Sequence, residues 1–206
     1  MTLYSLPLGS LSTNCYILAD EVTKNAMVID APDKACDIIA FAEGKGLTIT
    51  DIVLTHGHFD HILALSELKE KTSATLSVYE KTAELMCDPI YTLAKYVNEQ
   101  IPVTEADKLL RDGDEIDFFG NKTKVIHTPG HTADSICLLF DKTLISGDTL
   151  FNQSIGRWDH PTGDMAEELA SINEKLMVLP DDTAVYPGHG SPTTIGDERK
   201  GNIYIQ

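Results

Sequence analysis

The sequence contains no uninterrupted apolar run long enough to span a bilayer, so it predicts no transmembrane helix. Its first residues, 1–7, include neither the basic segment nor the cleavable apolar core of a signal peptide, and we therefore expect a cytoplasmic protein. Basic residues are also scarce, because 16 Lys and Arg stand against 32 Asp and Glu and give a formal net charge of −16. This charge disfavours nucleic acid and anionic membrane surfaces as partners.

Cysteine is rare as well, and the 4 cysteines form no Cys-x-x-Cys pair. Cys15 and Cys137 lie in strand-like runs, whereas Cys36 and Cys87 lie in helix-like runs. We expect buried free thiols, with disulfides as the alternative. Nothing in the sequence supports a cysteine nucleophile.

The sequence does contain a dense group of metal-binding side chains at residues 55–61, which read Thr-His-Gly-His-Phe-Asp-His. The apolar run before it predicts a buried strand and the residues after it predict a helix, so the group lies at the carboxyl end of a strand, where open α/β sheets place their sites. His56 and His58 are two residues apart and can face one ion, whereas Asp60 and His61 lie beyond the bend and can face a second. The alternative is a polar turn with scattered histidines.

The pattern His-x-His-x-Asp-His resembles the signature of the metallo-β-lactamase superfamily of metallohydrolases. Three further motifs of that superfamily follow in order, around His131 in Thr-Pro-Gly-His-Thr, Asp148 in Ser-Gly-Asp-Thr and His189 in Tyr-Pro-Gly-His-Gly. The alternation of strands and helices predicts an α/β protein. The resemblance implies the four-layer αββα sandwich of this superfamily, formed by residues 1–206 as a single domain.

The resemblance also implies a ligand set for two divalent metal ions, zinc or a mixture of zinc with iron or manganese. His56, His58 and His131 would bind the first ion, Asp60, His61 and His189 would bind the second, and Asp148 would bridge both. A hydroxide between the ions would be the nucleophile. Of these residues, Asp60 and Asp148 are the predicted catalytic carboxylates. Asp30, at the end of a strand, would support the metal loops from behind, with helix capping as the alternative.

The expected elements follow from hydrophobic periodicity and turn residues. Strands are predicted at 4–8, 14–19, 26–29, 51–54, 74–79, 115–119, 123–127, 135–140, 143–146 and 184–186. Helices are predicted at 33–43, 61–71, 80–86 and 164–179, and the stretch 88–105 is the least regular.

The segment 151–159, with its pattern Phe-x-x-x-x-Gly-Arg-x-Asp, resembles the glyoxalase II branch, which hydrolyses thioesters such as S-lactoylglutathione. Arg157 would pair with Asp159 or a neighbouring carboxylate and hold the loop below the metals, with a plain surface ion pair as the alternative. The sequence departs from glyoxalase II in three places, one of which is the stretch Ile62, Leu63 and Ala64, where that family usually has small glycine-rich residues. It ends soon after His189, where glyoxalase II has a helical extension that supplies much of its glutathione site, and it has Gly190 where that family has Glu.

These features predict a compact, glyoxalase-II-like hydrolase acting on a small (thio)ester, with an unknown oligomeric state. The alternative is a mononuclear iron persulfide dioxygenase, which shares much of the motif set. Nuclease and flavodiiron functions are disfavoured by the acidic charge and by His58, and a β-lactamase role is disfavoured because Asp148 stands where many such enzymes have Cys.

Four further side chains have open roles. We expect His127 to be a strand-end residue that makes hydrogen bonds. His160 is either an accessory residue at the pocket or a surface residue. Tyr91 and Tyr96 either line a substrate mouth or pack as an amphipathic segment.

Overall fold

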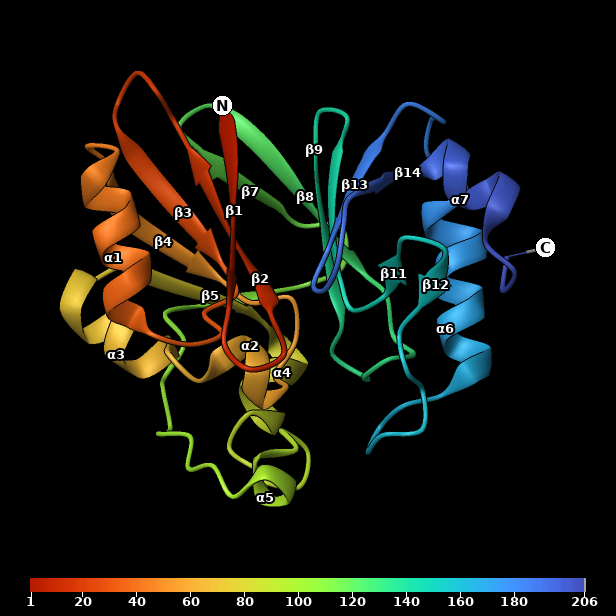
Figure 1. Ribbon diagram of the computed structural model, residues 1–206, viewed down its shortest axis with the longest axis horizontal. Coiled ribbons are helices and arrows are strands. Elements are labelled where there is room, and N and C mark those ends of the chain that lie inside the picture. The colour runs from red at the N-terminus through yellow and green to blue at the C-terminus, as the bar shows by residue number, and fades with distance from the viewer. Residues whose placement is uncertain (206) are drawn as a thin grey trace. The chain divides into compact units, whose positions relative to one another are not determined.

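Figure 1 shows the computed structural model of the protein, in which residues 1–205 are described. The chain divides into two compact units, one from Met1 to Leu110 and the other from Arg111 onward. Each unit contains one six-stranded sheet. The single domain expected for residues 1–206 stays a prediction.

The sheet of the first unit has its strands in sequence order. They are β1 (Thr2–Leu8), β2 (Thr13–Ala19), β3 (Asn25–Ile29), β4 (Thr48–Val53), β5 (Thr75–Tyr79) and β6 (Lys108–Leu110). The first three strands pair antiparallel, whereas β3 to β6 pair parallel. Parallel neighbours require crossovers, and helices supply them. These are α1 (Ala35–Gly44), α2 (Phe59–Ile62), α3 (Leu65–Thr72), α4 (Glu80–Leu85) and α5 (Ala94–Val97).

Helices α1 and α3 pack beside each other on β4 (Figure 1). Every residue of β2 is buried, which explains the apolar run from Cys15 to Ala19 that follows the polar Thr13 and Asn14. The predicted helix 61–71 is wrong at its start, because the structure has two helices, α2 and α3, with a break between them. The break has a backbone cause: Ala31 N–H donates to His61 O at 2.8 Å and Ala64 N–H donates to Ala31 O at 2.9 Å. His61 C=O and Ala64 N–H therefore bond to Ala31 and do not take part in the i to i+4 hydrogen bonds of a continuous α-helix.

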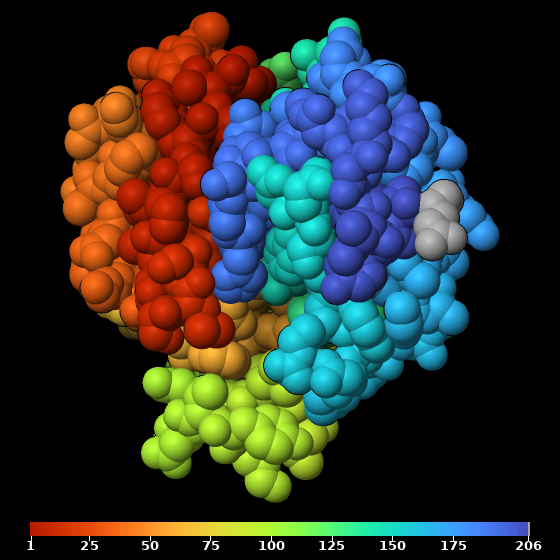
Figure 2. Space-filling model, turned by 45° about the vertical axis from the view of Figure 1, so that its right-hand side comes forward, coloured from red at the N-terminus to blue at the C-terminus, as the bar shows by residue number. Residues whose placement is uncertain are grey.

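The irregular segment 86–105 stands out from the rest of the first unit, as the yellow-green surface in Figure 2 shows. It exposes several large apolar side chains: Ile90, Tyr96, Val97 and Val103. Its inner end is attached to the ligand-rich turn, because Phe59 N–H donates to Thr92 O at 2.7 Å.

The sheet of the second unit has the order β14-β13-β10-β9-β8-β7. Its strands are β7 (Glu115–Phe118), β8 (Asn121–His127), β9 (Ile136–Phe140), β10 (Thr143–Gly147), β13 (Ala184–Pro187) and β14 (Thr193–Thr194). All neighbours are antiparallel except β10 and β13. Their crossover contains a small hairpin of β11 (Leu150–Phe151) and β12 (Ser154–Ile155), then α6 (Met165–Ser171) and the π-helix η1 (Ile172–Leu176). Helix α7 (Ile195–Gly201) follows β14.

Both predicted hairpins of this unit are present, but the turn of the first is tighter than expected. Phe118 pairs with Asn121, so Phe119 and Gly120 alone form the turn, and both have positive φ. Two consecutive residues with positive φ are typical of a type I′ turn, which matches the twist of a hairpin. The predicted helix 164–179 begins as expected at its N-cap Asp164, whose side chain accepts from Ala166 N–H and Glu167 N–H. It then continues as the π-helix instead of an α-helix.

The cysteine prediction is half right. All four thiols are free, and Cys15 and Cys137 are buried, but Cys36 and Cys87 are exposed. Cys36 lies on the outer face of α1, and Cys87 lies in the turn after α4. Burial raises the pKa of the Cys137 thiol to about 12, so this group stays protonated. Within residues 1–205, no helix combines the length and the apolar character that crossing a membrane requires.

Candidate metal centre

The donors of the first unit lie on the turn between β4 and α2. His56, His58 and His61 are all buried, and Asp60 is partly exposed. The ring nitrogens His56 Nε2 and His58 Nδ1 are 3.2 Å apart, and His61 Nε2 lies 3.6 Å from Asp60 Oδ2. The rings of His56 and His61 have centroids 4.1 Å apart. The turn therefore brings together the four donors that the sequence predicts for it.

These separations fit ligands that share a metal ion. Zinc held tetrahedrally at about 2.0–2.2 Å keeps two ligand atoms about 3.3–3.6 Å apart. The two distances above lie at or near that range. Imidazole and carboxylate are donors that zinc, iron and manganese accept. By geometry and by chemistry, this donor set fits a divalent transition metal.

Asp30 holds this turn from behind. The side chain is 1% exposed, and its oxygens accept from Thr55 N–H, from Thr55 Oγ1–H and from His61 Nδ1, each at 2.8 Å. A proton on His61 Nδ1 leaves the Nε2 lone pair for a metal. The capping alternative is wrong, because Lys34 is the N-cap of α1 and no side chain caps that helix. The contact that a supporting role requires is present, and the role itself stays a prediction.

Thr13, a residue that the sequence did not single out, orients Asp60. The hydroxyl of Thr13 donates to Asp60 Oδ2 at 2.9 Å across 47 residues of sequence, and Thr13 is buried on β2. This bond fixes Oδ2, the same oxygen that lies 3.6 Å from His61 Nε2, and so sets the orientation of the carboxylate. No sequence signal marks the contact, because threonine at the start of a buried strand is ordinary.

The donors of the second unit follow three strands that run in the same direction. His131 comes after β8, Asp148 directly after β10 and His189 after β13, so all three lie at one edge of the sheet. His131 Nε2 lies 3.7 Å and His189 Nε2 lies 3.5 Å from Asp148 Oδ2. Both nitrogens lie just beyond hydrogen-bond distance from this carboxylate oxygen. These N–O separations again fit the spacing of ligand atoms that share a metal ion.

His131 is fixed at two atoms. Its Nδ1 lies 2.7 Å from the main-chain oxygen of Arg157, and its backbone N–H donates to Glu168 Oε2 at 2.7 Å. Because a carbonyl oxygen only accepts, Nδ1 has the proton and Nε2 has the lone pair. Glu168, on α6, is fully buried and was not predicted. Burial raises the pKa of Glu168 to about 9, against the lowering effect of the N–H groups of His131 and Gly156.

Two glycines allow α6 to approach this loop. A Cβ on Gly130, which has φ +145, would lie 2.2 Å from Glu168 Cα. A Cβ on Gly156 would lie 2.0 Å from the main-chain oxygen of Asp148 and 2.8 Å from Glu168 Oε1. Both are impossible contacts, so the Gly-His and Gly-Arg pairs of the sequence are required by close backbone packing.

The remaining predicted residues have mixed outcomes. The side chain of Arg157 is exposed and forms a bidentate pair with Asp159 at 2.8 and 3.0 Å, so only its main chain touches a predicted ligand. This pair holds the pKa of Asp159 down, to about 2. His127 ends β8 and its Nε2 lies 3.0 Å from Ala133 O, as predicted. His160 is half-buried, with its ring centroid 6.2 Å from that of His131.

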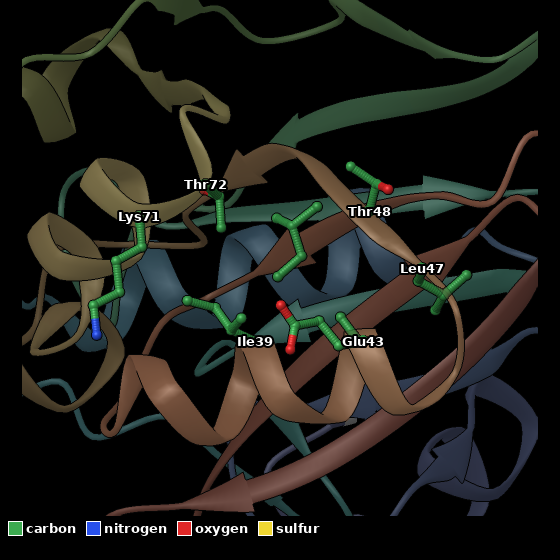
Figure 3. Close-up of a pocket in the computed structure, with 8 residues that line it drawn as sticks. Ile39, Glu43, Leu47, Thr48, Lys71 and Thr72 are labelled. Atoms are coloured by element: carbon green, nitrogen blue, oxygen red, sulfur yellow. The ribbon is translucent and has the colours of Figure 1, made fainter.

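The two tyrosines differ. Tyr91 is buried, with its ring centroid 6.2 Å from that of His58, whereas Tyr96 is exposed. A cavity of about 270 Å³ lies elsewhere in the first unit, between α1, β4 and α3 (Figure 3). Ile39 and Glu43 face Lys71 and Thr72 across it, and its lining includes no predicted metal ligand.

Comparison with known proteins agrees with this donor chemistry. The family model of the metallo-β-lactamase superfamily matches residues 8–189. The chain is 30% identical to the hydroxyacylglutathione hydrolase GloC of Haemophilus influenzae, over all of this chain and 98% of that protein. Among solved structures it is similar to the B3 metallo-β-lactamase BLEG-1, with a TM-score of 0.94 and 35% identity over 100% of both chains. It is also similar to TTHA1623 in a di-iron-bound form, with a TM-score of 0.86 and 30% identity over 98% of this chain and all of that one. The chain thus has the metallo-β-lactamase fold and belongs to the metallo-β-lactamase superfamily.

Proposed function

We propose that the protein is a thioesterase of the glyoxalase II type, which uses two divalent metal ions to hydrolyse substrates such as S-lactoylglutathione. The observation that supports this most directly is the fixed tautomer of two histidines. His61 and His131 each place Nδ1 against a main-chain or carboxylate oxygen, which leaves Nε2 for a metal. The similarity to GloC, a hydroxyacylglutathione hydrolase, supports the substrate class.

The proposed ligand assignment follows the superfamily pattern. In that pattern, His56, His58 and His131 would hold one ion, Asp60, His61 and His189 would hold the other, and Asp148 would serve both. Zinc is the first choice, and the similarity to a di-iron form of TTHA1623 supports iron as a second. The TTHA1623 structure and the shared donor chemistry support two ions per chain.

Bound metal would supply a water of lowered pKa as the nucleophile and would polarise the substrate carbonyl. The protein contributes the orientation of the donors: Asp30 fixes His61, Thr13 fixes Asp60, and Arg157 O with Glu168 fixes His131. In the overall reaction, water oxygen bonds to the acyl carbon, the C–S bond breaks, and the thiol leaves with a proton. No cysteine or serine nucleophile is needed.

Glutathione carries two carboxylates, and the stretch after His189 has only two basic residues that could meet them, Arg199 and Lys200. Arg199 is engaged by Asp181 and by the main-chain oxygens of Met177 and Leu179. Arg157 is engaged by Asp159. With a net charge of −16, little attraction remains for an anionic carrier. Weak binding that is equal in the ground and transition states raises KM and leaves kcat nearly unchanged.

The test is steady-state kinetics on S-lactoylglutathione with metal-loaded protein. We expect hydrolysis that saturates weakly, and a neutral acyl thioester should be used with a KM no worse than that of the glutathione thioester. If protein that holds two metal ions hydrolyses neither thioester, the thioesterase proposal is refuted. Saturation at micromolar S-lactoylglutathione would contradict the charge argument alone.

Two other reactions need direct comparison. The similarity to BLEG-1 favours β-lactam hydrolysis as a second candidate, which a nitrocefin assay on the same preparation tests. Persulfide dioxygenation, the alternative from the motif set, requires one iron and an empty second site. Elemental analysis together with oxygen uptake on glutathione persulfide separates it from hydrolysis.

A further inference from the structure

A fully buried carboxylate on α7, Glu198, receives four hydrogen bonds from three segments of the second unit. Thr193 Oγ1 at 2.6 Å and Gln153 Nε2 at 3.2 Å donate to Oε1. Asn202 Nδ2 at 2.8 Å and Gln153 N–H at 2.9 Å donate to Oε2. A carboxylate offers about four lone-pair sites, so Glu198 is saturated. Burying a carboxylate is costly unless it is satisfied in this way, which indicates a specific structural use.

Two of the bonded segments adjoin the predicted metal ligand His189. Thr193 belongs to the stretch that follows His189, and Gln153 forms the turn of the β11–β12 hairpin. Figure 1 shows this hairpin beside β13 and α7, and Figure 2 shows its cyan surface next to the indigo surface of the C-terminal helix. A second bond joins the same segments, from Asn152 Nδ2 to Pro192 O at 3.1 Å.

The hairpin also provides the surface on which the His189 ring rests. The rings of Phe151 and His189 lie edge to face, with centroids 6.2 Å apart. The side chain of His189 is 28% exposed, against 5% for His131. His189 is thus the less enclosed histidine ligand of this unit, and its orientation depends on the loop and the hairpin around it. Gln153 also packs closely on α7, which holds the hairpin in place. A Cβ on Gly201 would come 2.5 Å from Gln153 Oε1.

We propose that Glu198 is a positioning residue for the metal ligand His189. By joining the β11–β12 turn to the stretch after His189, it fixes both the backbone of this ligand and the aromatic surface under its ring. The proposal rests on the metal centre of the proposed function. It assigns Glu198 to the ion that His189 would hold, because in the proposed function the other ion would be held by His56, His58 and His131.

Glu198→Gln is the informative variant because it keeps size and shape. If the new NH₂ takes the Oε2 position, it faces the donors Gln153 N–H and Asn202 Nδ2. If it takes the Oε1 position, the Thr193 hydroxyl must turn and the Gln153 side-chain amide must flip before they can accept, so either orientation disturbs the network. Thr193→Val removes a single bond and is a second, milder variant. Glu167→Gln, which alters an exposed carboxylate on α6, is the matched control for charge.

Zinc binding is measured by competition with a chromophoric chelator, and folding by circular dichroism. We expect two ions for the wild type and for Glu167→Gln. For His189→Ala and Glu198→Gln, we expect an unchanged first affinity and a second affinity weaker by about 10- to 100-fold, with a smaller loss for Thr193→Val. If Glu198→Gln and Thr193→Val bind both ions as the wild type does while His189→Ala loses one, the positioning proposal is wrong and the proposed function stands. Equal loss of both ions in Glu198→Gln would make the role purely structural, and a wild type that binds no zinc would refute both proposals.

Discussion

Replacing Asp30 with Asn should impair metal binding while leaving the fold almost intact. Asp30 has a positive φ of 62°, a conformation that Asn adopts as readily as Asp, so the backbone has no reason to move. The side chains have the same shape. The difference is that one acceptor oxygen becomes an NH₂ donor. In the structure, three donors surround this carboxylate, so the new NH₂ faces a donor in place of an acceptor.

The amide has two orientations, and each has a different cost. In the first orientation, NH₂ takes the Oδ2 position and donates to both Thr55 Oγ1 and His61 Nδ1. The Thr55 hydroxyl can turn to accept this bond. His61 Nδ1 can accept only if its proton moves to Nε2. In the second orientation, NH₂ takes the Oδ1 position and faces Thr55 N–H, which is also a donor. One buried donor then lacks an acceptor, which costs about 1–3 kcal/mol of free energy. Metal-free protein therefore adopts the first orientation. Metal binding needs Nε2 deprotonated and forces the second, which corresponds to about a 5- to 150-fold loss of affinity.

The assay compares zinc affinity and thermal unfolding of metal-free protein for wild type, Asp30→Asn and Asp37→Asn. Asp37 is exposed on α1 and controls for the loss of one charge. We expect Asp30→Asn to unfold near the wild-type temperature and to lose affinity at the ion that His61 binds. Unchanged affinity for both ions would refute the tautomer argument. A large loss of stability without zinc would show that Asp30 acts mainly as a structural hub.

Further outcomes are expected at other positions. Asp148→Ala should reduce hydrolysis to background and lower the metal content by elemental analysis, because one carboxylate bridges both ions in the proposed assignment, and full activity would remove it from the site. Thr13→Val deletes the 2.9 Å bond to Asp60 and should weaken zinc binding by about tenfold, whereas Thr13→Ser should restore it; equal affinities for both variants would contradict this role. In Arg157→Ala, NMR titration should show the pKa of Asp159 rising from about 2 towards its usual 3.8. Because the folded-state pKa is the lower one, this pair contributes stability above pH 3.8 that is lost as the pH falls towards 2, and the variant should lack that dependence.

The sequence predicted those features that local pattern controls. The strands around β2 and the two hairpins of the second unit follow from apolar runs and turn residues, and their positions are nearly right. The turn at 55–61 was found because its donors are close in sequence. The break between α2 and α3 was missed because its cause, the backbone of Ala31, lies about thirty residues away and leaves no mark on the helical periodicity.

The supporting residues were missed for a related reason. Thr13, Glu168 and Glu198 each bond to a partner that only the fold brings near. In sequence, Glu168 and Glu198 look like helix-surface carboxylates, because each stands beside another charged residue. A buried acid is recognisable only when the donors around it are known. Asp30 is the exception, and it was found by resemblance to a family and not by spacing.

The π-helix after α6 has a consequence for the length of the chain. Met177 N–H donates to Ile172 O, five residues back, so this turn contains one residue more than an α-helix would use. That extra residue lets Leu176 stay in the core beside Ile172, while Glu168 and Ser171 face the His131 loop. Deleting Asn173 would restore α-helical spacing and rotate Leu176 by about 100° relative to Glu168, Ser171 and Ile172, which all precede the deletion. A single-codon deletion here should therefore be far more harmful than a substitution at the same half-buried residue, because it would turn the core side chain Leu176 away from its packing partners.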